Sequence, residues 1–108
     1  QKTFEVPAGV TVELVLENVD AMQHNLVIGQ IGSMEKIGAA ADKMITAADA
    51  VAKNYVPNIP EIIAYTPLVD PDGRVKLRFK APNTPGDYPF VCTFPGHWRI
   101  MNGVMKVK

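Results

Sequence analysis

The stretch from residue 74 to 80, "RVKLRFK", constrains the fold more than any other part of the chain. Its valine, leucine and phenylalanine alternate strictly with four cations, and only an extended strand sorts that period of two onto separate faces. It follows "DPDG" (residues 70–73), a strong turn signal. The stretch from residue 10 to 18, "VTVELVLEN", alternates in the same way. Two strands with one apolar face each are therefore predicted.

Four further short stretches favour strands, and turn signals such as "APNTPG" separate them. They are "HNLVIG" (24–29), "EIIAYTPLV" (61–69), "DYPFVC" (87–92) and "GVMKVK" (103–108). Short strands divided by turns are typical of antiparallel sandwiches and barrels, so the fold class is all-β.

One segment, residues 33–55, has helical rather than strand periodicity and is rich in alanine. Thr46 and Asp49 resemble a capping box, which predicts that a second helical piece begins there, and Pro57 ends it. The segment is predicted to be an amphipathic helical flap packed on the sandwich. Its apolar positions are Met34, Ile37, Ala41, Met44, Ile45, Ala48, Val51, Ala52 and Tyr55.

The length and charge of the chain indicate one domain and exclude some classes of function. A chain of 108 residues suits a single domain spanning 1–108, and 11 cations balance 11 anions. No basic patch favours nucleic acid, and no apolar stretch is long enough to span a bilayer. The N-terminal "QKTFEVPAG" lacks the apolar region of a signal peptide, so we expect a mature form or an excised domain. A single cysteine excludes an internal disulfide and favours a reactive thiol or a metal ligand.

Sulfur and nitrogen donors gather in "VCTFPGHWRIM" (residues 91–101). Alone, Cys92 and Met101 are better explained as core residues, His24 as a structural histidine and His97 as an exposed residue in a turn. Together, Cys92 ends one strand, Met101 begins the next, and the turn between them places His97 at the loop tip. The remaining histidine, His24, heads another strand that a sandwich can bring to the same end. Two imidazoles, a thiolate and a weak thioether are typical of a blue-copper electron-transfer site, whereas zinc does not favour a thioether.

These stretches carry a family resemblance. "CTFPGHWRIM" resembles the azurin ligand loop C-T-F-P-G-H-S-A-L-M, and "MQHNLVI" resembles azurin's M-G-H-N-W-V-L. The flap, "IAYT" and the closing "GVMKV" follow azurin in order, and auracyanins and other azurin-like cupredoxins are of the same type. The resemblance implies a Greek-key β-sandwich with one copper at one end. It makes His24, Cys92 and His97 the equatorial ligands, with Met101 axial.

The resemblance also implies roles around the metal. Asn25 would tie the two ligand loops together through Thr93, and Phe94 would pack near the metal and keep it dry. Gln23 stands where azurin has glycine, and its carbonyl is a candidate weak contact on the far axial side. Leu26 replaces a tryptophan, the azurin disulfide is absent, and the first strand is expected to be missing or trimmed. The last of these departures, the missing or trimmed first strand, favours a domain excised from a larger protein or a compact variant.

Other chemistries fit less well. A cysteine hydrolase leaves Met101 without a role, and no glycine-rich nucleophile turn precedes Cys92. A multicopper oxidase needs more histidines, a binuclear copper centre needs a second cysteine, and a chaperone or storage protein needs several exposed ligands. The sequence therefore predicts an electron carrier rather than an enzyme. The alternative is an electron-entry domain of a larger copper or haem redox enzyme.

Partner and location follow from the resemblance alone. Redox partners are expected to dock at the surface around His97, the protein is expected to be monomeric, and its location to be periplasmic or extracytoplasmic. The expected docking surface comprises Met22, Pro95, Gly96, Trp98, Arg99 and Ile100.

Overall fold

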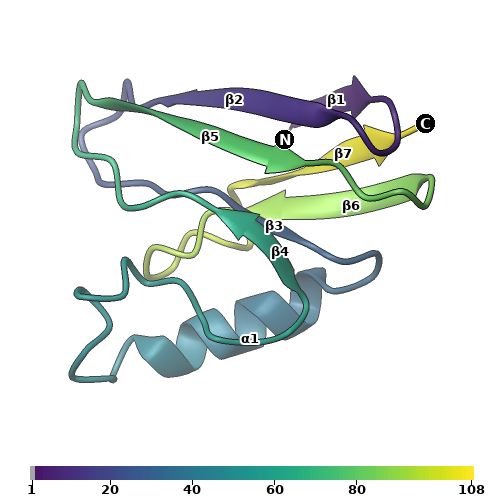
Figure 1. Cartoon of the computed structure of the whole chain (residues 1–108). Helices are drawn as coiled ribbons and strands as arrows, with labels where there is room; N and C mark the ends of the chain where they lie inside the picture. The colour runs from purple at the N-terminus through teal and green to yellow at the C-terminus, as the bar shows by residue number, and fades with distance from the viewer. Residues whose placement is uncertain (1) are drawn as a thin grey trace.

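Two β-sheets face each other in the computed structural model, which describes residues 2–108, and one helix covers an outer side (Figure 1). Within these residues the elements are β1 (Lys2–Val6), β2 (Thr11–Glu17), β3 (Val27–Gly29), α1 (Met34–Met44), β4 (Ile62–Tyr65), β5 (Arg74–Lys80), β6 (Gly86–Val91) and β7 (Asn102–Val107). One sheet has the order β1-β7-β6-β3-β4, and the other pairs β2 with β5. The all-β prediction with one short helical insertion is confirmed.

The predicted alternation of apolar and polar side chains is observed in the β2–β5 sheet. The antiparallel register places Leu14 opposite Leu77 and Val12 opposite Phe79, so the apolar side chains share one face. Leu14, Leu77 and Phe79 pack against a buried cluster of the larger sheet that includes Tyr88. Charged side chains occupy the outer face, as the period of two requires.

Strand β1 was not predicted from the sequence. It pairs in parallel with β7, from Lys2 opposite Gly103 to Val6 opposite Val107. Residues 3–6 alternate between polar and apolar, but the strand that pairs with β1 lies at the other end of the chain. A pairing over that sequence separation leaves no local pattern to detect.

The helix is shorter than the predicted flap. It ends at Met44, and residues 45–55 form successive turns, so the predicted second helical piece is wrong. The Thr46 hydroxyl donates back to the Lys43 carbonyl at 3.4 Å instead of capping a following helix. Asn54 and Tyr55 then adopt left-handed backbone conformations, which stop any helical continuation and turn the chain back to the sheet.

The helix lies on the larger sheet through Ile37, Gly38 and Ala41, which are its buried residues. Trp98, from the loop between β6 and β7, packs in the same cluster as Ile37 and Ala41. A Cβ atom at Gly38 would collide with the Trp98 ring, so the close approach needs glycine. Within residues 2–108, no helix has the length and apolar character needed to cross a membrane.

Candidate metal centre

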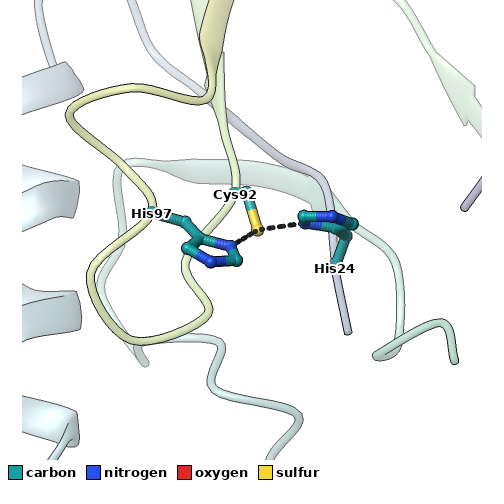
Figure 2. Close-up of side chains that lie close together, drawn as sticks. All are labelled: His24, Cys92 and His97. Atoms are coloured by element: carbon teal, nitrogen blue, oxygen red, sulfur yellow. Dashed lines mark hydrogen bonds between the residues drawn. The ribbon is translucent and has the colours of Figure 1, made fainter. Parts of the chain in front are cut away.

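Three potential metal ligands converge between strands that are distant in sequence. The Cys92 Sγ atom lies 3.7 Å from His24 Nδ1 and 3.6 Å from His97 Nδ1. All three donor atoms lie within 4.8 Å of one another, and Figure 2 shows both rings turned toward the sulfur. The residues are 6%, 5% and 8% exposed for His24, Cys92 and His97 respectively, so the donors are held away from water.

Backbone hydrogen bonds shape the loop that carries Cys92 and His97. Cys92 follows the end of β6 and Met101 precedes β7; the Cys92 N–H donates to the Met101 carbonyl at 3.0 Å and closes the loop. Inside it, the His97 N–H donates to the Phe94 carbonyl at 3.0 Å, and the Met101 N–H donates to the His97 carbonyl at 2.8 Å. Gly96 takes φ +82°, a turn conformation that favours glycine. The predicted position of His97 in the connecting loop is confirmed.

An isolated β-bridge to Val69 positions His24. Its N–H donates to the Val69 carbonyl at 3.2 Å, and the Val69 N–H donates to the His24 carbonyl at 2.7 Å. This single antiparallel pair lies outside the named strands, so His24 is anchored by backbone before β3 begins.

Asn25 joins the two ligand loops. Its Oδ1 accepts from the Thr93 N–H at 2.8 Å, and its Nδ2 donates to Thr93 Oγ1 at 2.8 Å. The same Nδ2 also donates to the Asn54 carbonyl at 2.8 Å, which ties the end of the flap to the site. The structure thus brings Asn25 and Thr93 into the contact that the sequence predicts.

Aromatic rings cover one side of the site. The Phe94 ring lies 5.0 Å from the His97 ring and 5.6 Å from the Tyr55 ring, measured between centroids. The His24 and His97 rings are themselves 5.1 Å apart. Phe94 therefore lies beside a candidate ligand, where it can exclude water, and Tyr55 is a neighbour that the sequence did not suggest.

Met101 and Gln23, the other two predicted contacts, are placed differently. Met101 is half-buried and lines, with His24 and Cys92, the wall of an open cavity of about 510 Å³. The Gln23 side chain donates to Asp70 Oδ1 at 2.7 Å. Met101 thus borders the donor set, while the axial roles of its sulfur and of the Gln23 carbonyl stay predictions.

Burial shifts the proton affinities of two donors. It raises the pKa of the Cys92 thiol, although backbone hydrogen bonds from Asn25 and Phe94 to the sulfur act in the opposite direction. Burial, and then repulsion from His24, lowers the pKa of His97, against a smaller opposing effect of Asp20. Without metal the thiol is therefore held protonated, and metal binding must release its proton.

Two contacts near the metal site were not predicted from the sequence. Asp20 Oδ2 lies 2.9 Å from His24 Nε2, on the side away from the sulfur. Trp98 Nε1 donates to Asp42 Oδ1 at 3.1 Å and joins the ligand loop to α1. An acidic residue four positions before a ligand histidine was a weak available signal, but nothing local indicated the Trp98–Asp42 pair, which spans 56 positions.

The predicted docking surface is only partly exposed. Trp98 is 9% exposed, so its assignment to that surface is wrong: the ring fills the space beneath α1. The Arg99 guanidinium lies above the Trp98 ring, 4.5 Å from its centroid, and 3.7 Å from Asp42 Oδ2. Gly96, Arg99, Met22 and Ile100 are exposed and Pro95 is half-buried.

The donor set can be tested for its fit to a metal ion. Metal–ligand bonds of about 2.0–2.3 Å, spread evenly in a plane, would separate nitrogen from sulfur by about 3.7 Å. The measured 3.6 and 3.7 Å match that spacing. One soft thiolate with two imidazoles suits copper, which accepts a trigonal set with a weak fourth ligand. His24, Cys92 and His97 are therefore positioned to bind a metal ion.

The chain is similar to known copper proteins. The family of copper binding proteins described as plastocyanin/azurin matches residues 1–108. Auracyanin-A of Chloroflexus aurantiacus is 36% identical over 104 residues, 94% of this chain and 62% of that protein. Outer membrane protein H.8 of Neisseria gonorrhoeae is 39% identical over 85 residues, 77% of this chain and 43% of that protein. The chain thus spans less than two thirds of the length of these curated relatives.

Solved structures agree with the sequence comparison. The structure of auracyanin A, a "blue" copper protein from Chloroflexus aurantiacus, matches with a TM-score of 0.88 and 34% identity. The match covers 100% of this chain and 86% of that chain. It confirms the predicted β-sandwich fold of the cupredoxins. With the whole chain matched by one family and its three principal donors in place, the chain belongs to the plastocyanin/azurin family of copper-binding proteins.

Proposed function

We propose that the chain is a type 1 copper protein that carries single electrons between redox partners. The observation that carries the proposal is the buried trio of His24, Cys92 and His97, in which the sulfur lies 3.7 and 3.6 Å from the two histidine Nδ1 atoms. Copper, when bound there, supplies a one-electron couple. The proposed metal ligands are these three residues with Met101 as a weak axial donor.

The chain's own residues give the site a fixed geometry. Asn25 and Thr93 hold the two ligand loops together by paired hydrogen bonds, and Phe94 and the sandwich interior limit access of water. A site that keeps its donors in place in both oxidation states needs little rearrangement when an electron moves. We assign the chain a carrier role rather than an enzymatic one because it belongs to the plastocyanin/azurin family of copper-binding proteins.

The electron would enter and leave beside His97. The residue is 8% exposed, and two large apolar side chains near its loop and the His24 loop, Ile100 and Met22, are exposed. An apolar rim around a ligand edge suits brief contact with redox proteins. We place the protein in the periplasm or another extracytoplasmic compartment, as the outer membrane relative suggests.

Copper titration of the apo-protein tests the proposal. We expect one copper per chain, with an intense visible charge-transfer band and the electron paramagnetic resonance spectrum of a strongly covalent copper–thiolate site. Cys92→Ser should abolish the colour because a hydroxyl cannot replace thiolate donation. Met44→Leu, which changes a half-buried sulfur at the far end of α1, should keep it. A colourless copper complex of the unmodified chain would refute the proposal.

A further inference from the structure

The two ligand histidines are held in different ways. Both turn Nδ1 toward Cys92 Sγ, but only His24 has its second nitrogen engaged: Nε2 lies 2.9 Å from Asp20 Oδ2. Among residues 2–108, His97 Nε2 makes no side-chain or backbone hydrogen bond. His24 is thus oriented from behind by a carboxylate, whereas the edge of His97 is left free.

The contact with Asp20 selects one form of the His24 ring. A neutral imidazole carries its hydrogen on one nitrogen, and an ionised carboxylate can only accept a hydrogen bond. The hydrogen therefore belongs on Nε2, which leaves the Nδ1 lone pair directed at the site. Carboxylates commonly orient metal-ligating histidines in this way and make the imidazole a stronger donor.

Asp20 is placed by a buried residue, Asn18, which is 2% exposed. Asn18 Oδ1 accepts from the Asp20 N–H at 2.9 Å, and its Nδ2 donates to the carbonyls of Met22 at 2.7 Å and Val69 at 2.8 Å. Val69 is also the backbone partner of His24. One amide thus fixes the loop between Asp20 and His24 and attaches it to the strand segment that anchors the histidine. The arrangement is built by protein groups alone.

We infer that Asp20 is a positioning residue for the metal site: it holds His24 as the Nε2–H tautomer and strengthens its Nδ1 donor. The inference rests on the proposed metal-binding function only for its effect on copper. Its effect on the tautomer is a property of the apo-protein. The Asp20 side chain is 60% exposed, so its negative charge acts through a partly screened contact.

The test compares Asp20→Ala and Asp20→Asn with Asp87→Ala, which removes an exposed carboxylate at the start of β6, away from the site. Nitrogen-15 NMR of the apo-proteins, at about pH 8 where imidazole is neutral, reports the His24 tautomer. Competition titrations then give Cu(II) affinity, and voltammetry gives the reduction potential. The tautomer reading remains valid even if no blue copper centre forms.

Wild type and Asp87→Ala should show a single Nε2–H tautomer at His24. Asp20→Ala should show a mixture, on the order of tenfold weaker Cu(II) binding and a raised potential, because weaker donation disfavours Cu(II). Asp20→Asn, whose amide oxygen can still accept, should restore the tautomer. An unchanged tautomer in Asp20→Ala would overturn the inference, even with a shifted potential, because Asp20 would then be only a nearby charge. A lost tautomer with unchanged affinity and potential would also overturn it.

Discussion

At the residue scale, hydrogen bonds that involve no metal set the directions of the donors. Asn25 spans the two ligand loops, Asp20 contacts His24 from behind, and the Cys92 N–H closes its own loop on Met101. Each contact uses a backbone group or a short side chain with few rotamers. The chain therefore pre-organises its donors, and substitutions nearby should change the metal's properties more than the fold.

Met101 should tune the potential rather than decide binding, since it borders the trio as a weak donor. Met101→Leu removes a donor to Cu(II) and should raise the reduction potential. Met101→Gln supplies a harder oxygen donor and should lower it. Voltammetry of both variants beside Met44→Leu checks the prediction, and three identical potentials would make Met101 a packing residue.

The pKa of His97 predicts how apo-protein stability depends on pH. Burial lowers this pKa below its ordinary value of 6.5, so the unfolded chain binds the proton more tightly. The His97 contribution is complete above the unfolded pKa and is lost as pH falls through the lower, folded pKa. Urea unfolding of the apo-protein between about pH 7.5 and 5.5 should show falling stability, with a smaller slope in His97→Gln. Stability that rises on acidification over this range would contradict the prediction.

At the scale of elements, the β6–β7 loop and α1 support each other. Trp98 leaves the ligand loop, fills the space above Gly38 and donates to Asp42 of the helix. Arg99 adds a contact from the same loop to the same carboxylate. The helix that the sequence marks as a flap thus buttresses the loop that carries Cys92 and His97.

Gly38→Ala tests that support because the substitution has two opposite effects on the free energy of unfolding. In an exposed helix the change would stabilise by up to about 1 kcal/mol. Here the new methyl group meets the Trp98 ring, and overpacking of this kind costs about 1–3 kcal/mol. We expect net destabilisation in denaturant unfolding and a perturbed visible spectrum of the copper form. Ala39→Leu, at an exposed position of the same helix, should change neither. If Gly38→Ala were more stable than wild type, the loop and helix would move apart at little cost, and the Trp98–Gly38 contact would not support the ligand loop.

At the scale of the whole molecule, the site lies at one end of the sandwich, where the loop from β6 to β7 meets the segment leading into β3 (Figure 1). The surface there includes two exposed apolar side chains, Met22 and Ile100, and an exposed cation, Arg99. The formal net charge of the chain is zero, so long-range attraction of partners depends on local charges such as this one.

Arg99 should therefore influence the rate at which charged partners react. Oxidation of the reduced protein by ferricyanide, an anion, should slow in Arg99→Glu, and oxidation by a cationic cobalt complex should accelerate. Both differences should shrink as salt is added, because exposed charges are screened. The control is Lys80→Glu, which changes an exposed lysine at the C-terminal end of β5. It should have less effect on either rate. Equal rates for the two variants would exclude Arg99 from the docking surface.

The sequence by itself determined the donor chemistry and the sheet faces. Cys92, His97 and Met101 lie within ten residues around one turn, and the alternation in residues 74–80 spans seven residues, so both patterns can be read from a short stretch of sequence. Such patterns act over a few residues, where spacing and periodicity fix which side chains share a side. His24 could be included because it was the only other histidine.

Only the tertiary structure decided how distant segments meet. It paired β1 with β7, ended α1 at Met44, and buried Trp98 where a docking residue was expected. It also placed Asp20 behind His24 through the contacts of Asn18. These outcomes depend on space left by other elements and on hydrogen-bond partners up to a hundred positions away. Because the β1–β7 pairing and the burial of Trp98 leave no periodic trace along the chain, no local pattern could predict them, whereas Asp20, four positions before His24, left only a weak local signal.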